Sequence, residues 1–548
     1  MSVHRVMGTE TEYAVSDSAA SGYDPIHLSF DVVRGASDER SRHIRWDYRQ
    51  EDPINDARGT RLERAAARPE MLTDTPSLHI TNVIAPNGGR IYVDHAHPEY
   101  SSPESTNPFE AVAYDAAGDA LMRVAAQQAT RLTHKQIVLH RNNVDGKGAS
   151  WGSHESYRSL RAVPFAVVSK MMTAHFVTRQ LFTGSGRVGV GERSEYSGYQ
   201  LSQRADYIHT PIGLQTTFDR PIVNTRDESH DCGEYRRLHV IVGDANRMQV
   251  PQLLKLGTTS MLLWLTEHAQ IVGVNLQELL DEVEFSDPVR ALHQVSHDLS
   301  LHQALNMRNG TQLTALQIQE RLYDAVCVVA RRVYGTDGTD EVLWPDTATR
   351  SIMVMWRRSL NDVMHIASCS ATQRLSLVTE ASRFEWLLKW QLLEGLRRRY
   401  YPNVSSSDQY GWNDSKLRAL DLSWGSLQSG ASVFEKVVAR CDCPVSKEAI
   451  AIAERQAPPD TRAWLRSRLL DVFPDEVVAM SWSSITVRDC ISTQSGASST
   501  LRSFDTSDPL AYGKEEVESI LISSQHAAQA LTRCEMEHHA HSATLHHT

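Results

Sequence analysis

Carboxylates gather at short spacing near the start of the chain. "GTETEY" places Glu10 and Glu12 two residues apart. On a strand this spacing points both side chains to one face, whereas on a helix they would lie about 200° apart. Two like charges on one face repel, so a partly buried pair needs a cation, and hard oxygen ligands suit magnesium better than zinc. The alternative is an exposed edge strand with two solvated glutamates, and the motif alone leaves both open.

A second group of ionisable residues is "IYVDHAHPEY" (91–100). Strand alternation predicts Tyr92 and Asp94 on one face and the two histidines on the other. Pro98 has no N–H, so it should end regular pairing and let Glu99 turn back toward the site. An HxH pair can bind zinc, but no HExxH and no downstream Cys/His set at metal spacing completes it. The pattern disfavours zinc and leaves a nucleophile, another metal or a polar loop.

Three further stretches could bind an anion. "NNVDGKGASWGSHESY" (142–157) is glycine-rich but lacks GxxxxGK[ST], so it is not a Walker A loop. "GSGRVG" (184–189) fits GxGxxG but follows a helical pattern, whereas a dinucleotide fingerprint follows a strand and opens a helix. In "YRRLHVIVGDAN" (235–246), Arg237 and His239 can face one cleft from a strand, with a guanidinium for phosphate oxygens. The alternative there is a surface strand with ordinary ion pairs.

The elements that must position these residues alternate between strands and long helices. Strand-like stretches cover 4–16, 89–100, 136–146 and 235–246, and each ends in turn-forming residues. A helix over 107–132 is predicted from Asn107 as cap, Pro108 after it and apolar residues every three or four positions. Further helices are expected at 250–271 and 313–334.

Chain length and breaks in the pattern predict more than one domain. With 548 residues, the chain exceeds the ~250–300 at which a single core usually stops growing. We expect a catalytic domain over 1–430, a small C-terminal domain over 431–512, and a C-terminal helix with a polar His-rich tail over 513–548. The charged stretch 35–75 is predicted to be a mobile insertion, either a lid or a regulator.

Composition excludes several classes of protein. A net charge of −11 disfavours nucleic-acid binding, which needs a basic face. No run approaches the ~18 apolar residues of a membrane span, and the N-terminus lacks a secretory signal, so we expect a cytoplasmic protein. Seven cysteines without a CxxC pair favour reduced thiols over disulfides or a zinc ribbon.

Seven ordered motifs together resemble one family. They are "GTETEY", "YVDHAHPEYS", "NNVDGKGASWGSHESY", "TGSGRVGVG", "QLSQRADYI", "NTRDES" and "YRRLHVIVGDAN", and "PPDTRAWLRSRLL" adds to them. They are similar to the family of Pup ligases and Pup deamidases/depupylases, which is related to glutamine synthetase. "VDHAHPEYS" and the charged insertion resemble its deamidase/depupylase branch. The implied fold is α+β: a glutamine-synthetase-like (carboxylate–amine ligase) large domain with a curved, mainly antiparallel sheet flanked by helices, plus a small helical C-terminal domain.

The resemblance also implies roles for individual residues. Asp94 matches the catalytic aspartate. The positions that contact magnesium around bound ATP are Glu10, Tyr92, Glu99, His154 and His239, and the nucleotide-contacting positions are Ser101, Ser102, Ser156 and Arg237. Weaker candidates for the same cleft are Glu12, Arg204 and Arg226. Ser105, Ser229 and the His-rich tail depart from the family pattern without touching a proposed ligand.

The implied reaction is hydrolysis at the γ-carbonyl of the C-terminal residue of Pup, with ATP and Mg²⁺ as cofactors. Glutamine becomes glutamate, or the isopeptide bond to a substrate lysine is cut, which makes Pup and pupylated proteins the partners and links the protein to the bacterial proteasome. Asp94 could attack the carbonyl or act as a base. The alternatives are a Pup–protein ligase of the same fold and a non-catalytic Pup-binding protein. "EGLRRRYYP" (394–402) is a candidate basic patch for Pup.

Overall fold

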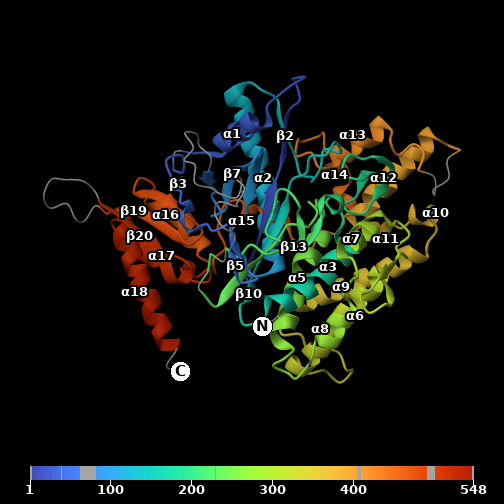
Figure 1. Cartoon of the computed structure of the whole chain (residues 1–548). Coiled ribbons are helices and arrows are strands. Elements are labelled where there is room, and N and C mark those ends of the chain that lie inside the picture. The colour runs from blue at the N-terminus through green and yellow to red at the C-terminus, as the bar shows by residue number, and fades with distance from the viewer. Residues whose placement is uncertain are drawn as a thin grey trace.

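The centre of the molecule is a six-stranded sheet in which every neighbouring pair is antiparallel (Figure 1). The computed structural model describes residues 3–38, 40–61, 82–228, 230–231, 233–403, 409–489 and 500–545. In spatial order the strands are β15 (Tyr235–Val240), β10 (Ser153–Leu160), β1 (Met7–Glu12), β8 (His97–Ser101), β7 (Arg90–Asp94) and β6 (Asn82–Ile84). The predicted mainly antiparallel sheet is confirmed.

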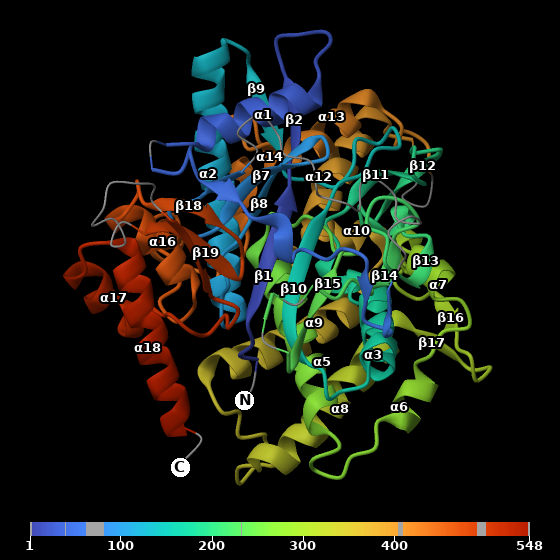
Figure 2. The same cartoon turned by 60° about the vertical axis from the view of Figure 1, so that its left-hand side comes forward.

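Helices cover one face of this sheet and leave the other for the polar side chains. α1 (Pro25–Ala36), α2 (Pro108–Thr133) and α5 (Gln249–His268) contact the strands, and α2 packs against both α1 and α5 (Figure 2). Thr11 of β1 donates a hydrogen bond to Asp115 of α2, so Thr11 faces the helices. Because side chains alternate along a strand, Glu10 and Glu12 face away from the helices.

The start of α2 is fixed by local sequence. The Asn107 side chain accepts hydrogen bonds from the backbone N–H groups of Phe109 and Glu110, and Pro108 occupies the first turn, where no N–H is required. The helix predicted over 107–132 is confirmed, as are those predicted at 250–271 and 313–334, which are α5 and α8 (Ala315–Tyr334).

The stretch 89–100 is a hairpin and not a single strand. β7 and β8 are joined by a two-residue turn in which His95 has a left-handed φ of 52°, as tight hairpins require. The prediction that Pro98 ends regular pairing is wrong, because Pro98 lies inside β8 opposite Val93, and its carbonyl accepts from Tyr13 N–H. Glu99 therefore reaches the site from a strand, directly opposite Tyr92.

The rest of the large unit surrounds the sheet with helices and short strand pairs. The helices are α3 (Phe165–Thr178), α4 (Gln180–Thr183), α6 (Gln277–Glu282), α7 (Pro288–His297), α9 (Thr347–Ser368), α10 (Ala371–Arg374), α11 (Val378–Ala381), α12 (Glu385–Tyr400), α13 (Ser415–Trp424), α14 (Val433–Val437) and α15 (Lys447–Ala453). The strand pairs are β2 (Ala14–Asp17) with β9 (Ile137–His140), β4 (Asn55–Asp56) with β5 (Thr60–Arg61), β11 (Arg187–Val190) with β12 (Tyr196–Gln200), β13 (Thr210–Gly213) with β14 (Pro221–Asn224), and β16 (Ala304–Asn306) with β17 (Gln312–Thr314). Single 3₁₀ turns are η1 (Tyr48–Gln50), η4 (Ala205–Tyr207) and η5 (Val438–Arg440).

A second hydrophobic core lies in the C-terminal unit. Its elements are β18 (Val477–Met480), β19 (Ser484–Asp489), β20 (Thr500–Asp505), α16 (Ala463–Val472), α17 (Lys514–Ser523) and α18 (Ala527–Leu545). β3 (Arg45–Trp46) pairs with β18, so the unit holds a four-stranded sheet besides the expected helices. Phe434 and Val445 pack in the larger core. The domain division at 430 stays a prediction.

A buried ion-pair cluster joins the large unit to the C-terminal unit. Glu104, just after β8, accepts hydrogen bonds from Arg462 and Arg466 at 2.8 and 2.5 Å. Burial acts to raise the pKa of Glu104, but the two guanidinium groups lower it to about 2. The C-terminal unit is therefore held to the strand end that leads into the candidate site.

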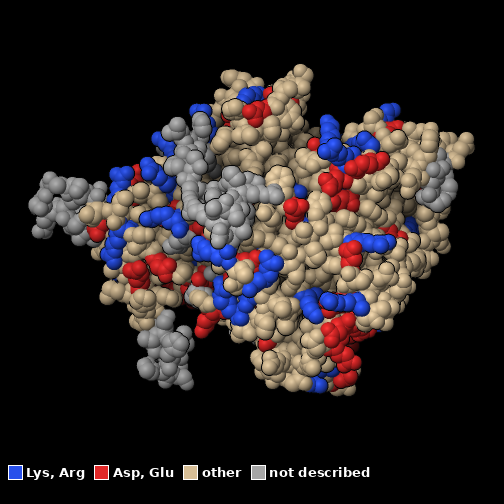
Figure 3. Space-filling view, viewed as in Figure 1, with Lys and Arg blue, Asp and Glu red and all other residues tan. Residues whose placement is uncertain are grey.

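Several expectations concern the surface and the insertion. Of the predicted mobile insertion 35–75, residues 39 and 62–75 lie outside the described residues, and so does Ser229. Two arginines of the 394–402 patch, Arg397 and Arg398, are paired with Glu394, whereas Arg399 is exposed, and a role for the patch in binding Pup stays a prediction. On the face in Figure 3, basic and acidic side chains are interspersed. Among the helices in the described ranges, none combines the length and apolar character that crossing a bilayer requires.

Candidate active site

The open face of the sheet forms the floor of a polar cavity of about 310 Å³. Its walls come from β1, β7, β8, β10 and β15, the turn after β7, and the segment 204–228. Of the candidate residues predicted from sequence, the cavity is lined by Glu10, Glu12, Tyr92, Asp94, Glu99, Ser101, His154, Arg204, Arg226, Arg237 and His239. The remaining two, Ser102 and Ser156, line an adjoining smaller cavity together with Ser101 and Arg237. The tertiary structure thus brings all thirteen candidates to two neighbouring cavities.

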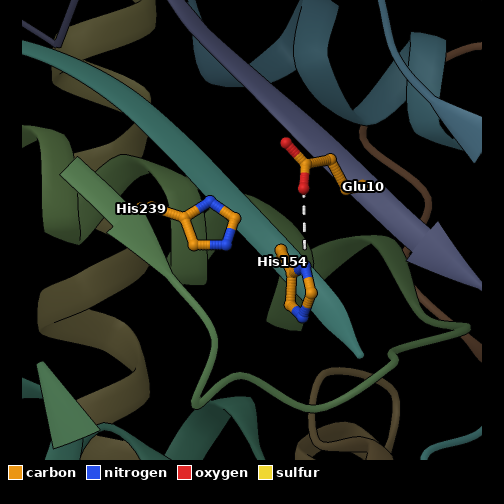
Figure 4. A group of neighbouring side chains, drawn as sticks. All are labelled: Glu10, His154 and His239. Atoms are coloured by element: carbon orange, nitrogen blue, oxygen red, sulfur yellow. Dashed lines mark hydrogen bonds and ion pairs between the residues drawn. The ribbon is translucent and has the colours of Figure 1, made fainter. Parts of the chain in front are cut away.

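One group of possible metal ligands consists of Glu10, His154 and His239, which project from three adjacent strands (Figure 4). One ligand atom from each lies within 4.8 Å of the other two. Glu10 and His154 are partners in the strand register, and Glu10 Oε2 lies 3.4 Å from His154 Nδ1. Gly152 makes room for this arrangement, because a Cβ there would overlap the His154 ring.

Charges around this group keep a carboxylate beside a neutral imidazole. Burial acts to raise the pKa of Glu10, but Arg237, 2.5 Å from its Oε1, and His154 hold it well below its usual range. Burial, with Arg237 next to it, lowers the pKa of His239 well below its usual range. A neutral imidazole and an ionised carboxylate are the forms that bind metals, so the donor set fits a divalent cation.

A second group consists of the carboxylates Glu12, Asp94 and Glu99, with one oxygen from each within 4.8 Å of the others. Burial and the neighbouring Asp94 and Glu12 raise the pKa of Glu99 well above its usual range. Burial acts on Asp94 in the same direction, but a 2.9 Å contact with His95 lowers its pKa below the usual value. Three carboxylates so close are stabilised by a cation. The Asp94 side chain is 38% exposed, so it is the member of the group that a substrate can reach.

Strand alternation predicts His97 on the face of the sheet opposite Asp94, and this prediction is wrong. His97 is the cross-strand partner of Asp94, and opposite residues share a face of a sheet. It therefore lines the cavity, with Nδ1 3.9 Å from Glu12 and its ring 5.2 Å from that of Trp151. Alternation along one strand could not show this, because the turn after Asp94 reverses the chain.

The smaller cavity lies between the sheet and the C-terminal unit. Gly8, Ser102 and Ser156 line one side, and Arg462 and Trp482 the other. Arg237 Nε donates a hydrogen bond to Ser156 Oγ at 3.0 Å. Hydroxyl groups, a guanidinium group and an aromatic wall are donors and a stacking surface suited to a nucleotide. Trp482 gave no signal in the sequence, because it stands far from the N-terminal motifs.

Arg204 is held in the cavity wall by a carboxylate on another segment. Asp244 accepts from the backbone N–H groups of Gln203 and Arg204 at 3.0 and 3.1 Å, from Ser202 Oγ at 2.7 Å and from Ser185 N–H at 2.8 Å. Asp244 follows β15, which carries His239, so it ties the Arg204 segment to the strand with the imidazole. The spacing of Arg204 and Asp244 in the sequence gave no sign of this contact.

Replacing Asp244 should therefore disturb Arg204. Asp244→Asn keeps the shape but turns an acceptor into a donor that faces N–H groups, so we expect a loss of about 1–3 kcal/mol in unfolding free energy and a raised KM. Asp119→Asn is the matched control, because Asp119 is a carboxylate that pairs with Arg141 and Tyr13 away from the cavity. Chemical denaturation and steady-state kinetics measure both. An unchanged KM in the Asp244 variant would contradict the positioning role.

The fold has relatives among solved structures. The structure of the complex between Pup and its ligase PafA matches with a TM-score of 0.71 at 24% identity, covering 95% of this chain and 91% of that chain. PafA in complex with ADP matches with a TM-score of 0.65 at 28% identity, covering 81% and 89%. The chain thus has the α+β fold of the Pup ligase, and the predicted fold class is confirmed.

Sequence similarity assigns the family. Residues 5–486 match the Pup-ligase protein family. The depupylase of Acidothermus cellulolyticus is 39% identical over 88% of this chain and 91% of its own, and the Pup deamidase/depupylase of Mycolicibacterium smegmatis is 37% identical over 96% and 99%. The Pup–protein ligase of Corynebacterium jeikeium is 31% identical over 81% and 89%. The chain belongs to the Pup ligase family.

Proposed function

We propose that this protein is a Pup deamidase and depupylase. The observation that carries the proposal is similarity along nearly the whole chain to relatives with that name. The cavity supports it: a reachable carboxylate, Asp94, stands beside two groups of cation ligands and next to a pocket suited to a nucleotide. The substrates are free Pup ending in glutamine and pupylated proteins, which links the reaction to the bacterial proteasome.

The reaction breaks the C–N bond at the γ-carbonyl of the C-terminal residue of Pup. A new C–O bond forms with oxygen from water, and ammonia or the lysine amine leaves with a proton. Asp94 is the group that meets this carbonyl, either attacking it or taking the proton of the attacking oxygen. Arg226 lines the wall of the same cavity and stabilises the charge that develops on the carbonyl oxygen.

The cofactors we propose are magnesium and ATP. Glu10, His154 and His239 would hold one cation, and the carboxylates beside Asp94 would hold another. When bound, magnesium supplies charge that offsets the clustered carboxylates and polarises oxygen. PafA has been crystallised with ADP. By analogy, the smaller cavity would hold the nucleotide, with Ser101, Ser102 and Ser156 along its wall and Arg237 at its phosphates.

A cleavage assay tests the proposal. Incubation with a Pup–substrate conjugate, ATP and magnesium should release free substrate and Pup, and removal of magnesium with a chelator should abolish release. The Pup–protein ligase of the same fold is the second candidate, because ligases are also relatives. A ligase would instead build conjugate from Pup ending in glutamate and form ADP in equal amount. Conjugate formation without release would overturn the proposed function.

A further inference from the structure

The cavity contains two arginines that differ from the others in it. Its five arginines are Arg90, Arg204, Arg220, Arg226 and Arg237. Three lie within 4.0 Å of a carboxylate: Arg90 at 3.8 Å from Glu51, Arg226 at 3.9 Å from Glu228, and Arg237 at 2.5 Å from Glu10. In the part of the chain that the structure describes, the guanidinium group of neither Arg204 nor Arg220 has a carboxylate within that distance. Arg204 and Arg220 are called the arginine pair below.

Neutral oxygens fix both members of the arginine pair. Arg204 donates to the carbonyls of Trp151 and Ile241 at 2.5 and 3.2 Å. Arg220 donates to the carbonyls of Thr216 and Ser150 at 3.0 and 3.2 Å. Within the described ranges, Nη2 of Arg204 and Nη1 of Arg220 donate to no protein atom. Both guanidinium groups are therefore oriented in advance, and each keeps one amino group for a ligand.

The charges of the pair are not balanced by their surroundings. Arg204 is 1% exposed, and burial together with Arg220 lowers its pKa to about 9. Burial also lowers the pKa of Arg220. The opposing charge that acts most strongly on both arginines is Glu12, which already accepts from Gly152 N–H at 2.6 Å, lies 3.9 Å from His97 Nδ1 and is grouped with Asp94 and Glu99. A buried cation without a paired anion is costly, so an incoming oxyanion would be bound strongly.

We propose that the arginine pair binds the free α-carboxylate of the C-terminal residue of Pup and that Arg220 is a specificity-determining residue. This rests on the proposed function. The bond that is cut is the C–N bond at the end of that residue's side chain. The α-carboxylate of the residue is therefore free both in Pup ending in glutamine and in a conjugate. With one amino group left on each guanidinium, the pair can donate one charge-assisted hydrogen bond to each oxygen of a carboxylate. Arg204 and Arg220 line the same cavity as Asp94, so a carboxylate on the pair would bring the γ-carbonyl of the same residue into the cavity that holds Asp94.

Pup with a modified C-terminus tests the proposal directly. Full-length Pup ending in glutamine is prepared with a free α-carboxylate or with an α-carboxamide, and loss of the γ-nitrogen is followed by mass spectrometry. For the unmodified enzyme, kcat/KM should be about 10- to 100-fold higher for the free acid, the range expected for hydrogen bonds to a charged group. Arg220→Gln should bring this acid-to-amide ratio close to one, mainly through KM, and Arg220→Lys should restore part of it.

The controls separate the possible failures. Arg357 on α9 forms an exposed ion pair with Asp324 on α8, and Arg357→Gln should leave the ratio unchanged. If the unmodified enzyme hydrolyses both forms equally, the inference is overturned and the proposed function stands; this needs no variant to fold. If it hydrolyses neither form, the proposed function fails. Inorganic phosphate is the competing oxyanion: a phosphate dependence of the rate that is lost in Arg220→Gln, with an unchanged acid-to-amide ratio, would assign the pair to phosphate and overturn the inference.

Discussion

Asp94→Asn should reduce depupylation and deamidation by about 10³-fold or more, the range associated with loss of a group that transfers a proton or attacks the substrate. The amide keeps the shape of the carboxylate and can still contact His95, but it is a poor base and a poor nucleophile. Release of substrate from a conjugate, followed on a gel, measures the effect. Asp337→Asn, in an exposed turn where the carboxylate accepts from the backbone N–H groups of Thr339 and Glu341, should keep full activity.

Two further measurements separate a loss of catalysis from a loss of folding or of nucleotide binding. The unfolding temperature and nucleotide affinity of the Asp94 variant should remain near those of the unmodified protein, because the Asp94 side chain is 38% exposed and does not line the smaller cavity. Full cleavage by the variant would remove Asp94 from the mechanism. A single turnover of the unmodified protein in ¹⁸O-labelled water then tests the nucleophilic role: label in Asp94 shows that an anhydride formed and that water opened it at the Asp94 carbonyl.

Glu104→Gln should destabilise the protein by about 3–5 kcal/mol, the cost of leaving buried charges without their partner. Arg462 and Arg466 are both almost fully buried and would lose the carboxylate that joins the two units. Since Arg462 and Trp482 line the smaller cavity, nucleotide affinity should fall as well. Denaturation with urea and a nucleotide titration measure the two effects. Glu518→Gln is the control, because that pair with Arg468 is about a quarter exposed and should be worth no more than about 1 kcal/mol.

The same ion pair predicts a pH dependence. The pKa of Glu104 is lowered from an ordinary 4.5 to about 2, so its stabilising contribution is complete above about pH 5 and is lost as the pH falls from about 4.5 to 2. The contribution is on the order of 3 kcal/mol, from about 1.4 kcal/mol per unit of pKa shift. The difference in unfolding free energy between the unmodified protein and Glu104→Gln should therefore shrink over that interval. A difference that stayed constant down to pH 2 would contradict this assignment.

The sequence by itself determined much of the fold and most of the candidate site. Local signals placed the long helices, because capping by Asn107 and the apolar periodicity of α2 act within a few residues. Alternation also put Glu10 and Glu12 on one face of a strand, and the family motifs named residues that meet at the two cavities.

Other features depend on contacts between distant segments, and only the tertiary structure decided them. The hairpin at His95 placed His97 beside Asp94 and kept Pro98 inside a strand, because strand register and not single-strand alternation sets which side chains share a face. Asp244, Arg220 and Trp482 gave no sequence signal. Their roles come from a loop that follows β15, an oriented guanidinium group and a second unit packed on the first. Sequence spacing carries information about one element, whereas charge balance inside a cavity is a property of all the elements that enclose it.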